Sequence, residues 1–397
     1  MKAAYIPVGA GGHILASLPM ISELVKKGVE VDYYAPESKR AQVEKVGAVL
    51  KAFPEVTECY SNEYMKTEDF LAVIPLVFLG MAKESIDIIE AQIKESMPDV
   101  LIVDQLALAG RLIAAKYHIP MIMFHSTFTA NDAFSISRLW PEYSEETSPA
   151  RRAARKLAEE FASEYGVEVM GVFEIFEGKG EYNISTLTKS YQPGGDAFDD
   201  EHYFFAGAQI APRDGDGSWK APENGKPLLY TSLGSLFNNW PEFYQMLFPV
   251  VKDLDINVLC SLGKTLKPED LGEIPSNVTT MAFTPQLEVL EKTDYFITHA
   301  GVGSLMEAFY YGVPCMCIPQ MDEQIFAAHH AKDMGLASEV LLKEQVTEDS
   351  LRAALTELIN NPKYKQNAKA ESEEMHKNGG CERAAQAVID FVNRKQK

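Results

Sequence analysis

The stretch YFITHAGVGSLMEAFYYGVPCMCI, residues 295–318, contains the pattern that decides the fold. Its first four residues are typical of a buried strand and run into a glycine turn. A helical pattern follows over 304–311, and a second apolar strand is predicted at 315–318. The same alternation continues through the rest of the chain. Short, continuously apolar strands such as VLIV at 100–103 are typical of a parallel sheet with both faces covered.

Both halves of the chain show this alternation of strands and helices. In the first half the pattern predicts strands at 2–8, 29–34, 100–103 and 121–124, and helices at 14–27, 40–46, 80–96 and 107–117. In the second half it predicts strands at 228–232, 257–262, 278–281, 295–298 and 315–318, and helices at 240–253, 304–311, 324–334, 350–359 and 363–377. Residues 70–82 are interpreted as a buried helix or pocket wall. Residues 151–165 are interpreted as an amphipathic helix that presents a solvated face or else serves as a lid or membrane-edge element.

The segment 206–227, rich in Pro, Gly and charge, has the composition of a linker between domains. We therefore predict an α/β protein with two doubly wound, Rossmann-like domains, 1–205 and 228–378, that face each other across a cleft. A last helix within 379–397 follows a Gly-Gly break and is expected to return to the first domain. In such sheets, ligands bind at the carboxyl ends of the strands.

Composition excludes several classes of function. The net charge of −20 argues against nucleic acid as a partner, because phosphate backbones are bound by basic surfaces. No apolar run reaches the length of a membrane span. The five scattered cysteines indicate a reducing, cytoplasmic setting. The acidic stretches DAFDDE and DGDG lack the glycine and glutamate spacing of a calcium loop, so we expect no metal site.

The loop VGAGGHILASL, residues 8–18, places His13 where a helix begins. Glycines allow the backbone to approach a ligand, and a helix start favours negative charge. The loop falls one glycine short of the dinucleotide fingerprint, since Ile14 occupies the third glycine position, and is weak evidence for a dehydrogenase. The positive end of the helix dipole disfavours a protonated imidazole, so we expect a neutral His13 able to act as a general base.

Asp104 ends the predicted strand at 100–103, and strand ends of one parallel sheet converge. Asp104 is therefore a candidate partner that orients His13 and stabilises its imidazolium form. From these residues alone, the simpler interpretation is that Asp104 caps the helix that follows.

The segment 283–324 carries a more specific pattern. The elements PQ, THAGVGSLMEA, GVP, P and EQ follow in the order and spacing of family 1 nucleotide-sugar glycosyltransferases of the GT-B fold. The chain resembles that family over its whole length, more strongly in the C-terminal half. One departure concerns the run after the first strand: many relatives have Gly-His-x-Asn-Pro, whereas this chain has Gly12-His13-Ile14-Leu15-Ala16. The double glycine is similar to that of lipid-sugar transferases, which leaves the acceptor class open.

The resemblance implies roles for particular residues. His299, Gly303 and Ser304 would hold the donor's phosphates, Glu307 the ribose hydroxyls, and Phe283 the base. The complete set of donor residues that it implies is Gly12, Ser235, Phe283, Gln286, His299, Gly301, Gly303, Ser304, Glu307, Glu323 and Gln324. It also implies that His13 is the general base and Asp104 the residue that orients it.

The activity implied is inverting transfer of a sugar from a nucleotide diphosphate, by family habit a UDP-sugar, to a hydroxyl of a hydrophobic small molecule. The nucleotide sugar is a co-substrate, and no cofactor is expected. Aromatic residues of the first domain are candidates for acceptor contact, together with His125: Phe78, Phe128 and Trp140. A lipid-acceptor glycosyltransferase, a nucleotide-sugar epimerase and a non-catalytic sugar-nucleotide sensor remain alternatives.

Overall fold

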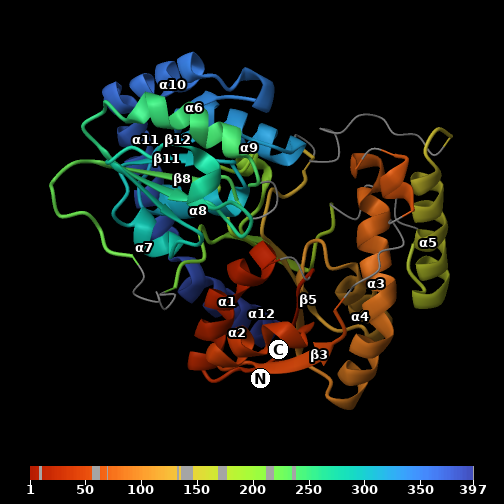
Figure 1. The fold of residues 1–397 in the computed structure, drawn as a ribbon. Helices are drawn as coiled ribbons and strands as arrows, with labels where there is room; N and C mark the ends of the chain where they lie inside the picture. The colour runs from red at the N-terminus through yellow and green to blue at the C-terminus, as the bar shows by residue number, and fades with distance from the viewer. Residues whose placement is uncertain are drawn as a thin grey trace. The chain divides into compact units, whose positions relative to one another are not determined.

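The computed structural model describes residues 1–8, 11–55, 63–68, 70–131, 134–135, 146–168, 177–211, 219–234 and 238–396. The chain forms two compact units. Unit 1 comprises Met1–Gln209 and Asn378–Lys397, and unit 2 comprises Ile210–Lys377. The labels used below are those of Figure 1.

Unit 1 contains a seven-stranded sheet in the order β3-β2-β1-β4-β5-β6-β7. Every neighbouring pair in this sheet is parallel. The strands are β1 (Lys2–Ile6), β2 (Glu30–Pro36), β3 (Val49–Phe53), β4 (Val100–Asp104), β5 (Met121–His125), β6 (Tyr182–Ser185) and β7 (Tyr203–Phe205). The central strand β4 is buried along its whole length, which matches the continuous apolar run that predicted it. The sequence pattern had not predicted β3, β6 or β7.

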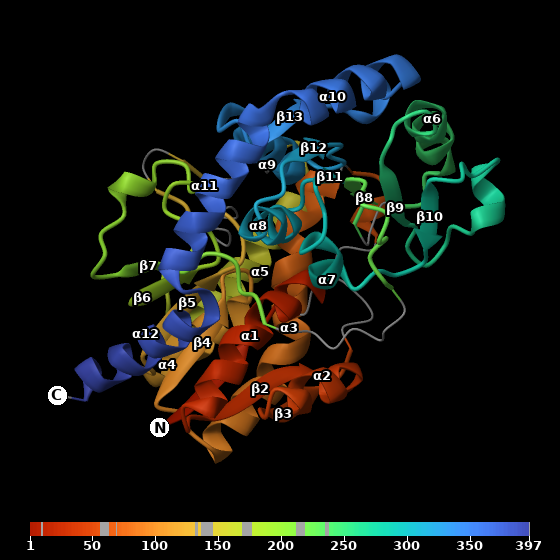
Figure 2. The same cartoon turned by 90° about the vertical axis from the view of Figure 1, so that its left-hand side faces the viewer.

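Helices cover both faces of this sheet. They are α1 (Gly11–Lys26), α2 (Arg40–Lys45), α3 (Phe70–Glu95), α4 (Leu108–Tyr117), α5 (Pro149–Tyr165) and α12 (Gly380–Lys395). On one face, apolar residues of α1 and α12 form a common core with β1, β2 and β5. These two helices lie side by side in Figure 2. In Figure 1, α3 and α5 run alongside each other.

Residues 70–95 form one helix, which corrects the prediction that divided them into a segment 70–82 and a helix 80–96. Pro75 is the sixth residue of α3. A proline removes one hydrogen bond and crowds the preceding turn, but a long helix can continue past it when tertiary packing supports it. Buried side chains on both sides of Pro75, Val73 and Leu76 among them, supply that packing.

Unit 2 contains a six-stranded parallel sheet in the order β10-β9-β8-β11-β12-β13. Its strands are β8 (Leu228–Ser232), β9 (Asn257–Ser261), β10 (Val278–Met281), β11 (Tyr295–Thr298), β12 (Cys315–Cys317) and β13 (Ala337–Val340). Its helices are α6 (Pro241–Val251), α7 (Gln286–Leu290), α8 (Val302–Tyr310), α9 (Asp322–Asp333), α10 (Glu348–Asn360) and α11 (Pro362–Asn378). Strand β13 and helix α7 were not predicted.

One face of this second sheet packs against α6 and α10. Alternate strand residues such as Leu229, Val258 and Ile297 join a core with Leu247 and Leu355 of those helices. Across the described residues of both units, no helix is long and apolar enough to cross a membrane.

Candidate active site

The carboxyl ends of three neighbouring strands bring polar residues together in unit 1. Strands β1, β4 and β5 are adjacent and parallel, so the residues that follow them lie at one edge of the sheet. His13 lies in the first turn of α1, which follows β1. Asp104 is the last residue of β4, and Ser126 comes directly after β5.

The structure places the imidazole of His13 against the carboxylate of Asp104. His13 Nδ1 lies 2.8 Å from Asp104 Oδ2. Asp104 is fully buried, whereas 22% of the His13 side chain is exposed. The second oxygen, Oδ1, accepts a hydrogen bond of 3.0 Å from the backbone N–H of Leu106. Asp104 therefore contacts His13, as one prediction had it. It does not cap α4, whose N-cap is Ala107 with no side-chain cap hydrogen bond; it holds the turn that precedes this helix instead.

These contacts fix which nitrogen of His13 carries a proton. An ionised carboxylate only accepts hydrogen bonds, so Nδ1 must donate to Asp104. The neutral ring then has its lone pair on Nε2. The arrangement therefore makes Nε2 the nitrogen that can take a proton from another group, and places a buried negative charge behind the ring to stabilise the imidazolium.

Ser126 is a third member of this cluster that sequence reasoning missed. Its hydroxyl lies 2.7 Å from His13 Nδ1 and 3.4 Å from Asp104 Oδ2. The available signal was its position after β5, the strand next to β4. Our sequence analysis selected its neighbour His125 instead.

The predicted acceptor residues have different surroundings. His125 is 2% exposed, and its Nε2 lies 3.1 Å from Asn183 Oδ1. Burial lowers the pKa of His125 to about 4, so the ring is neutral. Phe128 is buried among Phe134 and Tyr191. This placement favours packing roles for His125 and Phe128, while Trp140 lies outside the described residues.

Phe78 lines a cavity of about 120 Å³ in unit 1. The cavity lies beneath α3, beside residues that follow β1 and β4. Its lining is mostly apolar, from Val8, Phe53, Phe78, Ile89 and Leu108 among others. Leu106, two residues after Asp104, also contributes to it. An apolar cavity next to the residues that hold the dyad suits a hydrophobic group of a substrate.

In unit 2, the predicted phosphate residue His299 follows β11, and Gly234 follows the adjacent strand β8. A Cβ atom on Gly234 would lie 2.7 Å from His299 Nε2, and one on Gly301 would lie 2.6 Å from it. The two glycines therefore make room for the imidazole. Between His299 and α8, Ala300 has a φ of 62°, a left-handed conformation that costs energy in a residue with a Cβ.

The electrostatics of His299 follow from its packing. Burial lowers its pKa to about 4, so the ring is neutral. Its Nδ1 is buried, with no hydrogen-bond partner in the described part of the chain. The backbone of Ser232 lies close enough to the ring to oppose this lowering of the pKa in part, so the nitrogen is not without polar surroundings.

A hydrogen-bonded chain connects several predicted donor residues. Gln286 Nε2 donates to Glu307 Oε2 at 2.6 Å and lies 3.4 Å from Ser304 Oγ. Gln286 Oε1 accepts from Tyr230 OH at 3.3 Å, and Tyr230 OH also lies 2.6 Å from Thr284 Oγ1. The chain fixes the Glu307 carboxylate one turn into α8. Neither Tyr230 nor Thr284 was predicted as a site residue, although Tyr230 lies within the predicted strand 228–232 and Thr284 directly follows Phe283.

The remaining predicted donor residues lie separately. Phe283, after β10, is 60% exposed, an unusual state for a large apolar ring. Gln324 is buried in α9 and accepts a 2.9 Å hydrogen bond from the backbone of Gln320, while Glu323 is half-buried in the first turn of α9. Gly303 has open space around it, as does Gly12, which lies in unit 1. Ser235 lies outside the described residues.

Sequence comparison relates this chain to a known family. The family model for UDP-glucoronosyl and UDP-glucosyl transferase matches residues 219–396. NDP-glycosyltransferase YjiC of Bacillus subtilis is 33% identical over 98% of this chain and 97% of its own length. The chain belongs to this glycosyltransferase family. Demethyllactenocin mycarosyltransferase of Streptomyces fradiae is less similar to this chain: it is 27% identical over 98% of this chain and 86% of its own length.

Solved structures agree with the fold of the glycosyltransferase. The glycotransferase of kitacinnamycin superposes with a TM-score of 0.85 at 28% identity, covering 98% of both chains. CalG4, the calicheamicin glycosyltransferase, gives a TM-score of 0.85 at 25% identity, covering 100% of this chain and 99% of its own. The predicted family and the predicted pair of doubly wound GT-B domains are therefore confirmed.

Proposed function

We propose that this glycosyltransferase moves a sugar from a nucleotide diphosphate to a hydroxyl of a hydrophobic small molecule, with inversion at the anomeric carbon. The observation that carries the proposal is the 2.8 Å contact between His13 Nδ1 and the buried carboxylate of Asp104. It supplies a general base of the correct tautomer.

In this reaction His13 Nε2 removes the proton of the acceptor hydroxyl as its oxygen attacks the anomeric carbon. The bond from that carbon to the diphosphate oxygen breaks as the new glycosidic bond forms. Attack from the face opposite the leaving group, in a single displacement, inverts the configuration. Asp104 stabilises the imidazolium that results, because its charge is buried and directed at Nδ1.

Unit 2 is proposed to hold the donor. Helix α8 directs its first backbone N–H groups at the diphosphate, beside the neutral ring of His299. Charge that develops on the leaving diphosphate is then stabilised by groups that need no rearrangement. The protein therefore supplies from its own residues the stabilisation of the leaving group, and we propose that the reaction needs no cofactor.

The ribose and base would bind next to these groups. Glu307, held in place by Gln286, can accept hydrogen bonds from two ribose hydroxyls. A 2′-deoxyribose offers one hydroxyl fewer, which favours UDP over dTDP. The exposed ring of Phe283 provides a face for stacking of the base. Glu323 and Gln324 are proposed to contact the sugar hydroxyls.

The acceptor is proposed to place an apolar group in the cavity of unit 1 beside the dyad. The volume of about 120 Å³ holds a group near the size of one benzene ring. The rest of a larger acceptor would remain outside this cavity. The residues that line the cavity therefore do not limit the total size of the acceptor.

The test combines an activity screen with a matched pair of histidine variants. Purified protein is incubated with UDP-glucose, UDP-galactose or dTDP-glucose and with phenolic, macrolide or sterol acceptors, and products are identified by mass spectrometry and anomeric NMR couplings. We expect His13→Ala to lose about 10²- to 10⁴-fold in kcat, with UDP affinity unchanged. His118→Asn is the control, because His118 is exposed, has a φ of 51° that Asn tolerates, and should leave transfer unchanged.

The outcomes separate the proposal from its rivals. Normal turnover by His13→Ala, or a product that retains the anomeric configuration, would contradict it. Conversion of UDP-glucose to another UDP-sugar without an acceptor would identify an epimerase. Nucleotide binding without turnover across the panel would identify a sensor, and turnover confined to lipid acceptors in vesicles would identify a lipid glycosyltransferase.

A further inference from the structure

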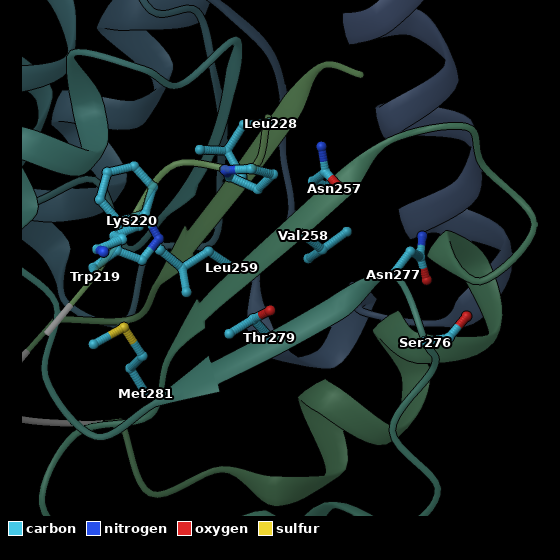
Figure 3. Close-up of a pocket in the computed structure, with 11 residues that line it drawn as sticks. Trp219, Lys220, Leu228, Asn257, Val258, Leu259, Ser276, Asn277, Thr279 and Met281 are labelled. Atoms are coloured by element: carbon cyan, nitrogen blue, oxygen red, sulfur yellow. The ribbon is translucent and has the colours of Figure 1, made fainter. Parts of the chain in front are cut away.

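A second cavity, of about 380 Å³, lies in unit 2 between residues 219–222 and strands β8, β9 and β10 (Figure 3). Its volume falls within the range of small-molecule sites. None of the residues assigned above to the nucleotide sugar lines it. The proposed transfer reaction therefore leaves this cavity without a role.

The wall of the cavity is the sheet face opposite the main core of unit 2. Val258 and Cys260 of β9 point into that core. Side chains alternate along a strand, so Leu259 points to the other side, toward the cavity. Figure 3 shows Leu259 and Met281 on the same side of the strands as the indole of Trp219. Leu259 itself is buried, so the apolar wall that the cavity offers to a ligand comes mainly from half-buried Met281, beside the flat aromatic surface of Trp219.

The polar residues of the cavity fall into two groups. The first group is already used by the protein: Asn257 exchanges hydrogen bonds of 2.8 and 2.9 Å with Asn224, and Asn277 Nδ2 is directed at the backbone carbonyls of Val251 and Ile256. In the second group, the side chains of Lys220, Ser276 and Thr279 are exposed and make no hydrogen bond or ion pair within the described ranges of the chain. The Oδ1 of Asn277 is buried and has no hydrogen-bond partner in the described part of the chain. The exposed groups that can donate to a ligand are therefore one cation and two hydroxyls.

We propose that this cavity binds a flat aromatic anion of about two rings, stacked against Trp219 with its anionic group at Lys220. The indole and the apolar wall suit the rings, and the ammonium and hydroxyl donors suit an anionic acceptor of hydrogen bonds. The chain as a whole has a net charge of −20, so its general field repels anions. Binding of an anion here thus depends on the local cation rather than on the overall charge.

The probe is naphthalene-2-sulfonate, a flat two-ring anion, and its neutral counterpart is naphthalene-2-sulfonamide, in which an NH₂ group replaces the charged oxygen. Both are titrated by fluorescence against the full chain in saturating UDP, which keeps the donor site filled. We expect one binding site for the anionic probe to disappear in Thr279→Trp, whose indole would occupy the cavity. Lys220→Met should weaken the anionic probe about fivefold and leave the neutral probe unchanged, since exposed ion pairs contribute modestly.

Lys226→Met is the matched control. Lys226 lies six residues further along the same segment, is ion-paired with Asp255, and does not line the cavity. Unchanged stoichiometry and affinity in both Thr279→Trp and Lys220→Met would overturn the proposal. Equal weakening by Lys220→Met and Lys226→Met would overturn it too, because that result indicates general charge attraction. If Thr279→Trp fails to fold, the pair of lysine variants decides the question alone.

Discussion

The contacts of Asp104 predict an unusual order of severity for its substitutions. In Asp104→Asn, the N–H of Leu106 still requires an acceptor, because it bonds to Oδ1 at 3.0 Å in the wild type. The carbonyl of the new amide therefore takes the Oδ1 position, and its NH₂ group faces His13 Nδ1. An NH₂ group only donates, so Nδ1 must accept and the proton of the ring moves to Nε2. The histidine is then held in the tautomer that cannot act as a base.

The size of the effect follows from two contributions. Loss of a hydrogen bond to a charged group costs about 1.5–3 kcal/mol, or roughly 10- to 150-fold in rate. The inverted tautomer removes the base function itself, worth about 10²- to 10⁴-fold. We therefore expect kcat of Asp104→Asn to fall by about 10³-fold or more. Asp104→Ala also loses the charge but imposes no tautomer, so it should retain more activity than Asp104→Asn.

The assay measures kcat and acceptor KM for the wild type, Asp104→Asn and Asp104→Ala, with UDP affinity from calorimetry. The ¹⁵N chemical shifts of the His13 ring report the tautomer directly. UDP affinity should be unchanged, because Phe283, His299 and Glu307, which are proposed to bind the base, the diphosphate and the ribose, lie in unit 2. If Asp104→Asn remains within about fivefold of the wild type, or if Asp104→Ala is the more damaged variant, the tautomer argument is wrong.

Three further predictions concern stability, donor binding and metal dependence. Burial opposes ionisation of Glu90, but hydrogen bonds from Lys94, Tyr117, Lys116 and Tyr165 outweigh it and lower its pKa to about 2. The ionised carboxylate therefore stabilises the fold above the unfolded-state pKa, and this contribution is lost as the pH falls toward 2. In urea unfolding, Glu90→Gln should lower the free energy of unfolding by about 1–2 kcal/mol at neutral pH. A loss that stays constant between about pH 5 and 3 would contradict this. Gly234→Ala should weaken UDP binding at least about tenfold, because its Cβ would lie 2.7 Å from His299 Nε2 at a φ of 80°. Gly28→Ala is the control for backbone strain alone, because Gly28 has a φ of 84° and open space around an added Cβ. If calorimetry gives the two variants equal UDP affinity, the steric argument is refuted. Transfer assayed after dialysis against EDTA should keep its rate, since backbone amides of α8 and His299 are proposed to stabilise the leaving diphosphate; a rate restored only by Mg²⁺ would reject that proposal.

The sequence by itself predicted most of the elements that build the two sheets. Strands β8, β10 and β11 begin and end where the sequence pattern predicted. In β8 and β11 the reason is burial, because an interior strand of a parallel sheet is covered on both faces and is mostly apolar. Strands β3, β6 and β13 escaped prediction because runs such as VLKAF, YNIS and ASEV contain polar residues. Helix α3 was divided wrongly because Pro75 is a local signal, whereas the packing that carries the helix past it is not local.

The sequence also supplied the residues that define the candidate site, because glycine turns and helix starts are local features. It could not decide whether Asp104 caps the following helix or contacts His13, and it missed Ser126. Those contacts join residues 91 and 113 positions apart in the chain. Which side chains meet at such separations depends on the order of the strands, and β1, β4 and β5 become neighbours only when the sheet has formed. The sequence thus determines which chemical groups are available. The tertiary structure decides their hydrogen-bond partners, and therefore the tautomer of the base.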